Sequence, residues 1–343
     1  MGNDREHGGE KGLGEFEIIA RYFAPLATDS AALGLRDDAA ILAVTEGYEL
    51  VATCDTLIEG VHFLPDDPPN SLGYKALAVN LSDLAAKGAR GYVYLLALAV
   101  PPNTSPEWFA AFATGLGELQ EETGITLVGG DTTAAPGPIT MTITALGLVS
   151  HGHAVFRHGA KPADRLYVSG TIGDAYLGLR LLKEPALAKS WNLTEAERAF
   201  LIERYRRPRP RMGLVIPLRN FAQAAIDVSD GLAGDIEKLA KMSHAGAVFE
   251  AGRVPFSDAA RKVLSREPAL LATLLTAGDD YEIVAAVPEA NTGAFEAEAK
   301  NRAVPVTSIG RIEGQKDGVR AIGFDRRPLA LERKGFAHFF AHF

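Results

Sequence analysis

Several aspartates stand where an apolar, strand-like run of the sequence gives way to small residues. They are Asp37, Asp38, Asp55, Asp131, Asp227 and Asp230. Open sheets bind ligands at the carboxyl ends of their strands, where the chain turns and small side chains leave room. A single aspartate beside glycine is also typical of a turn or a helix cap. Because every member ends an apolar run, we expect the set to converge on one crevice.

Carboxylates gathered at one place need a counter-charge. Two of them about 5 Å apart repel by roughly 3 kcal/mol at an effective dielectric near 20, so such a cluster is protonated, spread apart or bound to cations. Magnesium takes hard oxygen ligands, keeps several waters and bridges carboxylates to phosphates. The pattern therefore favours bound magnesium, through which a protein of formal net charge -8 would hold ATP.

Two predicted helices add polar groups to this set. Asn80 and Asp83 lie three residues apart in a helical segment and share a face, although Asp83 could instead form a surface pair with Lys87. In IDVSDGLAGDIEKLAK, either Ser229 or Asp230 is expected to cap the following helix. Backbone amides at that helix start would favour a phosphate, and plain capping remains the alternative.

Alternation of short apolar runs with helical stretches indicates a mixed α/β or α+β fold. The strands expected are residues 50–53, 92–100, 126–128, 139–149, 165–168, 224–228, 281–287 and 306–312. A helix is predicted from Thr104 as cap, with Pro106 in its first turn and Glu107 three residues after the cap, to a stop at Gly124.

Length and composition favour two domains. With 343 residues, of which 47% are hydrophobic, the chain can bury a large core. Residues 1–13 read as a flexible tail, and a loop rich in glycine and histidine after residue 150 marks a boundary. We therefore expect an N-terminal domain over 14–150 and a C-terminal domain over 151–343.

The composition argues against several classes of protein. The longest apolar run, 92–100, is too short to span a bilayer, and the amino terminus lacks an apolar signal core, so we expect no membrane contact. The acidic balance disfavours nucleic acid. The single cysteine, Cys54, excludes an internal disulfide and is typical of a buried, inert thiol in a cytoplasmic protein.

Common nucleotide and hydrolase motifs are absent. The sequence holds no Gly-Lys dipeptide and so no Walker A loop, and no His-Arg-Asp triplet. It also lacks the His-Glu-x-x-His, Gly-x-Ser-x-Gly and G-x-G-x-x-G patterns. A nucleotide site in this chain must therefore be of another kind.

The segments GEFEIIARYF, DDAAIL, TCDTLIEGVHF, YKALAVNLSDLAAKGA, LVGGDTT, HGAKPAD, VSDGL and GDDYE resemble, in this order, the motifs of the thiamine-monophosphate kinase family. This family belongs to the ATP-binding superfamily of aminoimidazole ribonucleotide synthetase. The resemblance implies a two-domain α/β (α+β) protein, with an N-terminal mixed-sheet domain that forms a homodimer and a C-terminal α+β domain. It also implies thiamine monophosphate and ATP as substrates.

The resemblance also implies site residues. Those matching magnesium ligands are Asp38, Thr53, Asp55, Asp83, Asp131, Asp227 and Asp230, with Asp131 and Asp230 the most important for catalysis and Cys54 contributing at most its backbone. Those matching ATP contacts are Gly130, Asp131, Arg157 and Ser229. Those matching substrate contacts are His62, Asp279 and Phe336. Taken alone, His62 reads as a turn histidine, Arg157 as a solvated loop residue and Phe336 as a core or tail aromatic.

Three positions depart from the family pattern. Arg36 stands where relatives usually have glycine, which alters the loop before the paired acids. Asp279 replaces a frequent glutamate and is one methylene shorter. Phe336 replaces tyrosine or tryptophan, so that it keeps an aromatic surface but loses a hydrogen-bonding group.

Both lines of argument predict direct in-line phosphoryl transfer without a phosphoenzyme. Among related enzymes, selenophosphate synthetase needs an early reactive cysteine and the hydrogenase-maturation relative a carboxyl-terminal one, and this chain ends in HFFAHF. Aminoimidazole ribonucleotide synthetase fits TCDTLIEGVHF and GDDYE less well. The alternative from another class is a catalytically silent nucleotide-binding protein, which the full set of acidic residues disfavours.

Overall fold

The computed structural model describes residues 14–37 and 39–331. The helices are α1 Glu15–Ile18, α2 Pro69–Ala86, α3 Pro106–Thr123, α4 Asp174–Lys183, α5 Leu187–Ser190, α6 Glu195–Arg206, α7 Val215–Phe221, α8 Leu232–Met242, α9 Asp258–Arg266, α10 Leu270–Thr276 and α11 Thr292–Asn301. The strands are β1 Tyr48–Ile58, β2 Arg90–Val100, β3 Thr126–Ala134, β4 Thr140–Ser150, β5 Arg165–Ser169, β6 Ala224–Val228, β7 Gly246–Glu250, β8 Glu282–Val287, β9 Val306–Glu313 and β10 Val319–Ile322.

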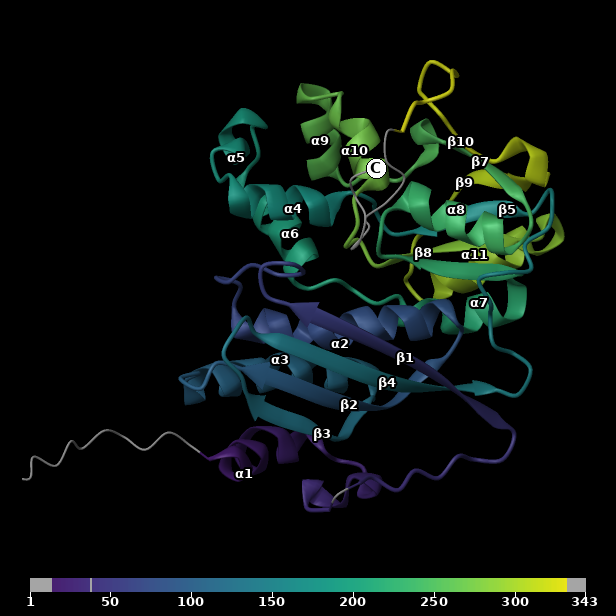
Figure 1. The fold of residues 1–343 in the computed structure, drawn as a ribbon. Coiled ribbons are helices and arrows are strands. Elements are labelled where there is room, and N and C mark those ends of the chain that lie inside the picture. Colours follow the sequence, from purple (N-terminus) through teal and green to yellow (C-terminus); the bar gives the residue numbers. More distant parts are fainter. Residues whose placement is uncertain (1–13, 38, 332–343) are drawn as a thin grey trace, which may run out of the picture. The chain divides into compact units, whose positions relative to one another are not determined.

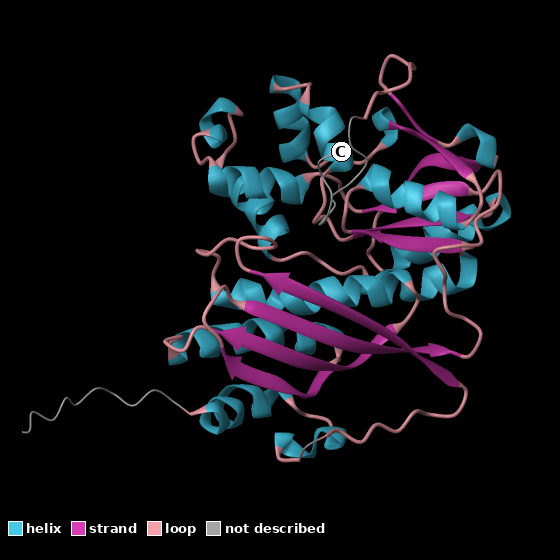
Figure 2. Ribbon diagram, in the orientation of Figure 1, coloured by secondary structure: helices cyan, strands magenta, loops and turns pink. Residues whose placement is uncertain are grey.

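The strands form two sheets, so the mixed α/β architecture is confirmed (Figures 1 and 2). One sheet has the order β1-β4-β2-β3, with β2 and β3 parallel. The other has the order β10-β7-β9-β5-β8-β6, in which only the β10–β7 pair is parallel. Every expected strand is present, and β7 and β10 are additional short strands that the sequence analysis missed.

The six-stranded sheet separates two apolar cores because successive side chains of a strand point to opposite faces. In β8, Val284 and Ala286 pack with residues of α4, α8, α9 and α10. Ile283, Ala285 and Val287 pack instead with residues of α7 and α11. Burial on both faces explains why β8 is apolar without a break from Ile283 to Val287.

Helices α2 and α3 are in contact through glycines. A Cβ atom on Gly115 would lie 1.8 Å from the carbonyl oxygen of Asn70, and one on Gly73 would lie 2.1 Å from that of Phe112. Only glycine allows so close an approach of two helix backbones. From Leu77 to Ala86 helix α2 is buried except at Asp83. This part of the helix is therefore surrounded by packed side chains, which fix its position.

The predicted cap of α3 is wrong by one residue. The side chain of Ser105 accepts the amide hydrogen of Trp108 and caps the helix, whereas the Thr104 hydroxyl donates to the carbonyl oxygen of Pro101 over 2.7 Å. Ser105 is the residue directly before Pro106, which stands at the first helical position. The predicted stop at Gly124 is confirmed, with a left-handed φ of 75°.

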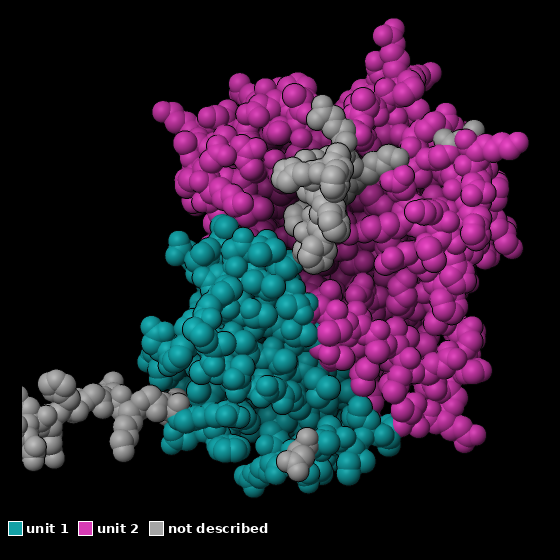
Figure 3. Space-filling view, viewed as in Figure 1, with its two compact units in different colours: residues 1–43, 56–76, 93–143 teal, residues 44–55, 77–92, 144–343 magenta. Residues whose placement is uncertain are grey.

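The described chain forms two compact units (Figure 3). The first contains residues up to 43 together with 56–76 and 93–143, and the second contains 44–55, 77–92 and the described residues from 144 onward. The predicted domain boundary near residue 150 stays a prediction. Within 14–37 and 39–331, no helix has both the length and the apolar character needed to cross a bilayer.

Candidate active site

Strand β6 ends in a buried carboxylate of the second unit. By the alternation of the strand, Asp227 shares a face with Ala225, whose core includes Ala85 and Ala86 of helix α2. From the same helix, the Ser82 hydroxyl donates a hydrogen bond of 3.2 Å to Oδ2 of Asp227. Packing of α2 on this face therefore brings the NLSDLAAKG segment to the end of β6.

The predicted aspartates of this unit act on one another through their charges. Burial raises the pKa of Asp227 well above its ordinary value, and the charges of Asp83, Asp235 and Asp55 raise it further. Burial likewise raises the pKa of Asp55 to about 6, with added effects of Asp83 and Asp230. The structure thus gathers Asp55, Asp83, Asp227 and Asp230, and we call these four residues the carboxylate cluster.

Thr53 and Asp83 are joined directly. The Thr53 hydroxyl donates a hydrogen bond of 2.5 Å to Oδ2 of Asp83. Two residues further along β1, on the same face of the strand, comes Asp55. The surface partner considered for Asp83, Lys87, donates to the carbonyl oxygen of Ala225 over 3.0 Å. Strand β1 therefore supplies Thr53 and Asp55 to the carboxylate cluster, and helix α2 supplies Ser82 and Asp83.

Asp235 and Lys238 belong to the site and were missed by the sequence analysis. Oδ2 of Asp235 accepts the amide hydrogens of Asp230 at 3.0 Å and Gly231 at 3.1 Å. Lys238 Nζ lies 2.7 Å from Oδ1 of Asp235 and also forms an ion pair with Asp230. An acidic residue in the first turn of α8, three residues before a lysine, was the signal that could have pointed to this pair.

The predicted cap of α8 is wrong. Gly231, with a φ of 121°, occupies the cap position, and neither Ser229 nor Asp230 caps the helix through its side chain. The amides before the helix are bound by Asp235 instead, from within the first turn. The side chain of Asp230 is consequently left to Lys238 and to the carboxylate cluster.

The loop at 278–281 lies against the loop that carries Ser229. The amide of Asp279 donates to the carbonyl oxygen of Ser229 over 2.9 Å, and that of Tyr281 donates to Val228 over 2.8 Å. A Cβ atom on Gly278 would lie 2.2 Å from the same Ser229 oxygen. Tyr281, which the sequence analysis did not single out, is buried beside the cluster. Burial raises its pKa, and the charges of Asp279, Asp55, Asp227 and Asp83 add to the effect.

Positive charge lies beside β6. The amide of Ala225 donates to the carbonyl oxygen of Phe156 over 2.9 Å, which places the exposed Arg157 next to the strand. Burial lowers the pKa of Lys87 to about 8, and the neighbouring charge of Arg157 contributes to the decrease. Arg157 is thus free of the core and available to an anionic ligand.

Three predicted site residues belong to the first unit. Gly130 and Asp131 are exposed on β3, where Asp131 is in register with Ala97 of β2. Gly130 has a φ of 150°, and a Cβ atom there would lie 1.8 Å from the carbonyl oxygen of Leu96. Nδ1 of His62 accepts the amide hydrogen of Ile58 at 3.0 Å, as expected for a turn histidine. Asp38 and Phe336 lie outside the described residues.

The donor atoms of the carboxylate cluster fit magnesium. They are hard oxygens, and burial together with the neighbouring carboxylates raises the pKa of Asp55 and Asp227, an effect that a bound cation would oppose. Within the part of the chain that the structure describes, no three His, Cys, Asp or Glu side chains form a ready-made metal site. Magnesium does not require one, because it usually binds through one or two carboxylates, waters and substrate phosphates. The cluster therefore suits a metal that arrives with a nucleotide.

Comparison with known proteins shows a relationship along almost the whole chain. Residues 36–149 match the N-terminal domain and residues 161–322 the C-terminal domain of AIR synthase related proteins. The chain is 41% identical over 329 residues to the thiamine-monophosphate kinase of Escherichia coli (strain K12), which covers 95% of this chain and 98% of that protein.

Solved structures agree with this relationship. The crystal structure of a thiamine-monophosphate kinase from Stenotrophomonas maltophilia K279a is 40% identical, with a TM-score of 0.79, over 89% of this chain and 94% of that one. The structure of AaThiL complexed with AMPPCP and TMP is 29% identical, with a TM-score of 0.75, over 87% of this chain and 89% of that one. The chain is therefore a member of the thiamine-monophosphate kinase family, within the AIR synthase related proteins.

Proposed function

We propose that the protein transfers the γ-phosphoryl group of ATP to thiamine monophosphate and so forms thiamine diphosphate and ADP. The observation that carries this proposal is the convergence of Asp55, Asp83, Asp227 and Asp230 on one place, where each raises the cost of ionising another. The names of the relatives and the AMPPCP and TMP bound to AaThiL support the same substrates.

The roles we propose follow the family motifs. The magnesium ligands would be Asp38, Thr53, Asp55, Asp83, Asp131, Asp227 and Asp230, with Asp131 and Asp230 the most important for catalysis. ATP would contact Gly130, Asp131, Arg157 and Ser229. Thiamine monophosphate would contact His62, Asp279 and Phe336.

The acceptor needs no strong general base. A phosphomonoester has a second pKa of about 6, so its oxygen is already ionised near neutral pH. That oxygen attacks the γ-phosphorus in line as the bond to the bridging β–γ oxygen breaks, and ADP leaves with the bond's electrons. Bound magnesium would neutralise the phosphate oxygens and reduce the repulsion between the two anions.

The chain's own contribution is to hold the two anions in line. The backbone amides of Asp279 and Tyr281 donate hydrogen bonds to the Ser229 loop and so connect a proposed substrate contact to a proposed nucleotide contact. Arg157, exposed beside β6, is placed to balance phosphate charge. A thiamine phosphate held beside Asp279 would thus lie next to the Ser229 loop, which would contact ATP.

A chromatographic assay tests the reaction. Purified protein, ATP and magnesium are incubated with thiamine monophosphate or with unphosphorylated thiamine, and the products are separated. We expect thiamine diphosphate and ADP in equal amounts from the monophosphate alone. ATP made chiral at the γ-phosphorus should give inverted configuration, whereas retention or a competent phosphoenzyme would contradict direct transfer.

We also propose that the protein is a homodimer joined through its four-stranded sheet. Strand β1 is an edge of that sheet, is eleven residues long, and exposes the apolar side chains of Tyr48 and Leu50. Long exposed edges of this kind favour pairing with another chain. Sedimentation should show a dimer that Leu50→Asp dissociates, while Phe200→Asp, at an exposed apolar position of α6, leaves it intact.

The proposed place of action is the cytoplasm. Cys54 is the single cysteine of the chain and is exposed rather than buried, which corrects the expected burial of its thiol. Successive side chains of β1 point to opposite faces of the sheet, and the face that carries Cys54 is exposed. Fractionation of cells of the source organism, followed by immunodetection of the native protein, would test the location.

A further inference from the structure

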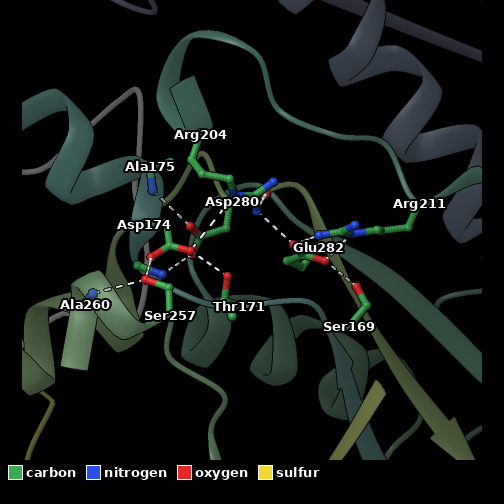
Figure 4. A network of polar contacts seen from close by, with 11 residues as sticks. Ser169, Thr171, Asp174, Ala175, Arg204, Arg211, Ser257, Ala260, Asp280 and Glu282 are labelled. Atoms are coloured by element: carbon green, nitrogen blue, oxygen red, sulfur yellow. Dashed lines mark hydrogen bonds and ion pairs between the residues drawn. The ribbon is translucent and has the colours of Figure 1, made fainter. Parts of the chain in front are cut away.

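Two arginines converge on one buried carboxylate at the start of β8 (Figure 4). Arg204 Nη2 donates to Glu282 over 2.8 Å, Arg211 Nε over 2.6 Å and the Ser169 hydroxyl over 2.6 Å. Burial alone would raise the pKa of Glu282, but the charges of Arg211 and Arg204 bring it below its ordinary value. Glu282 is therefore an ionised carboxylate held by charge-assisted hydrogen bonds.

A second buried carboxylate is anchored two residues earlier. Asp280 accepts the amide hydrogens of Gly173 at 2.7 Å and Ala175 at 3.3 Å, at the start of helix α4. Arg204 Nη2 also donates to the carbonyl oxygen of Asp280 over 3.3 Å. One arginine thus binds both the backbone of Asp280 and the side chain of Glu282.

The residues that flank Asp280 have a strained backbone. Asp279 has a φ of 73° and Tyr281 a φ of 49°, in the left-handed region that side chains with a Cβ atom disfavour. Such conformations persist only where the surrounding structure determines them, and they are typical of functional sites. The hydrogen bonds of Asp280 and Glu282 contribute to this constraint, together with those that the amides of Asp279 and Tyr281 donate.

The loop has two sides with different surroundings. Asp280 and Glu282 enter the arginine network, whereas Tyr281 lies beside Asp55, Asp83 and Asp227 of the carboxylate cluster. The amides of Asp279 and Tyr281 bind the carbonyl oxygens of Ser229 and Val228. Movement at the network would therefore move the loop relative to the cluster.

Stability alone is a weak explanation for this network. A buried ion pair often contributes no more than apolar residues of the same volume, because desolvation of the charges offsets their attraction. The network is also tightly enclosed, since a Cβ atom on Gly170 would lie 2.1 Å from Oε1 of Glu282. The charged groups of Arg204, Arg211 and Glu282 instead fix the backbone conformation of the strained loop.

We propose that Arg204, Arg211 and Glu282 are positioning residues, which hold the loop of residues 279–281 in its left-handed conformation against the Ser229 loop. None of them is among the proposed substrate or metal contacts, and they act through Asp279 and Tyr281. This inference rests on the proposed function, because it makes the loop part of the phosphoryl-transfer centre. It adds residues outside the proposed ligand set to those that decide the rate.

The test compares Arg211→Gln with Arg211→Lys. Lysine keeps the positive charge but loses the two-pronged contact, and glutamine loses the charge as well. Hydrogen exchange of the peptide that covers residues 277–283 should accelerate at least about tenfold in Arg211→Gln, since a charge-assisted bond is lost. We expect kcat to fall by a similar factor and Arg211→Lys to recover part of both losses.

Ser257→Ala is the matched control. The Ser257 hydroxyl donates to Asp174, on the far side of the network, and its oxygen caps helix α9. This variant should lower the melting temperature without accelerating exchange at 277–283 or lowering kcat. Glu282→Gln should change exchange and kcat in the same direction as Arg211→Gln and by more, provided that it folds.

Equal exchange at 277–283 in Arg211→Gln and Ser257→Ala, compared at equal loss of global stability, would overturn the proposal. So would a normal kcat in Arg211→Gln with accelerated exchange. Exchange is measured without substrate, so it judges the role of the network even if the wild-type protein fails to phosphorylate thiamine monophosphate. That failure would contradict the proposed function but not the positioning role of the network.

Discussion

The Ser82 hydroxyl in helix α2 donates a hydrogen bond to Asp227 at the end of β6, across 145 positions of the sequence. This bond is a direct link between the helix that carries Asp83 and the strand that leads into the Ser229 loop. It also gives the buried Asp227 carboxylate a donor, which partly offsets the burial that raises its pKa. Ser82 is thus a structural support of the carboxylate cluster.

Ser82→Ala should weaken both folding and magnesium use. Loss of the donor leaves a buried carboxylate less well solvated and should lower the free energy of unfolding by about 1–3 kcal/mol. The magnesium concentration for half-maximal activity should rise. Ser71→Ala in the same helix, where the hydroxyl donates to Pro68 at 2.7 Å, should cost stability alone. An equal magnesium requirement in both variants would show that Ser82 has no part in the site.

Asp230→Asn should reduce turnover about a hundredfold or more, because a charged group at the phosphoryl-transfer centre is lost. The side chain is 33% exposed, so the fold should tolerate the change well. Steady-state kinetics at limiting and saturating magnesium, with circular dichroism for folding, provide the measurement. Asp258→Asn, at a side chain that is 91% exposed, is the control. Wild-type activity of Asp230→Asn at limiting magnesium would remove it from the ligand set.

Asp131→Asn provides an independent test in the first unit. Asp131 is exposed on β3, so its replacement should leave the unfolding midpoint nearly unchanged. Turnover should nevertheless fall steeply, because the carboxylate is proposed to bind both metal and nucleotide. Calorimetric titration with magnesium and AMPPCP should show weaker binding, and unchanged affinity together with unchanged turnover would refute the role.

Asp55→Asn should separate stability from activity. The pKa of Asp55 is raised to about 6 in the folded protein, so between about pH 4 and 6 the folded state binds more protons than the unfolded state. Stability of the metal-free protein is therefore lost as the pH rises through this window. In chelator at pH 8 the asparagine variant should melt at a higher temperature than the wild type. When magnesium is added, the wild type should be active and the variant inactive. A lower melting temperature than that of the wild type would contradict the assignment.

Lys87→Gln should change the stability profile at alkaline pH. Burial and Arg157 lower the pKa of Lys87 to about 8, while Asp227 and Asp83 act in the opposite direction. Between pH 8 and the ordinary lysine pKa of 10.5, the unfolded state binds more protons, so the wild type gains stability as the pH rises. Denaturant unfolding of Lys87→Gln should lack this gain, and Lys189→Gln at an exposed position should keep it.

Local signals were sufficient for most of the fold. Alternation in 139–149 predicted β4, and the apolar stretch that starts at Ile283 within 281–287 predicted β8, because a strand's burial pattern is written in its own residues. The strands β7 and β10 were missed because β7 starts with glycine and ends with glutamate, and β10 has only four residues, one of which is Arg320. Helix starts were less certain: neighbouring polar residues compete for the cap, as Thr104 and Ser105 do before α3.

The sequence by itself determined most of the secondary structure, the family and the aspartates worth attention, because each is encoded in contiguous residues. Only the tertiary structure decided that Asp55, Asp83, Asp227 and Asp230 share one place and that Asp235, Lys238 and Tyr281 belong with them. The physical reason is that such contacts join segments far apart in the chain. Their distances are set by helix and sheet packing, which no local pattern records.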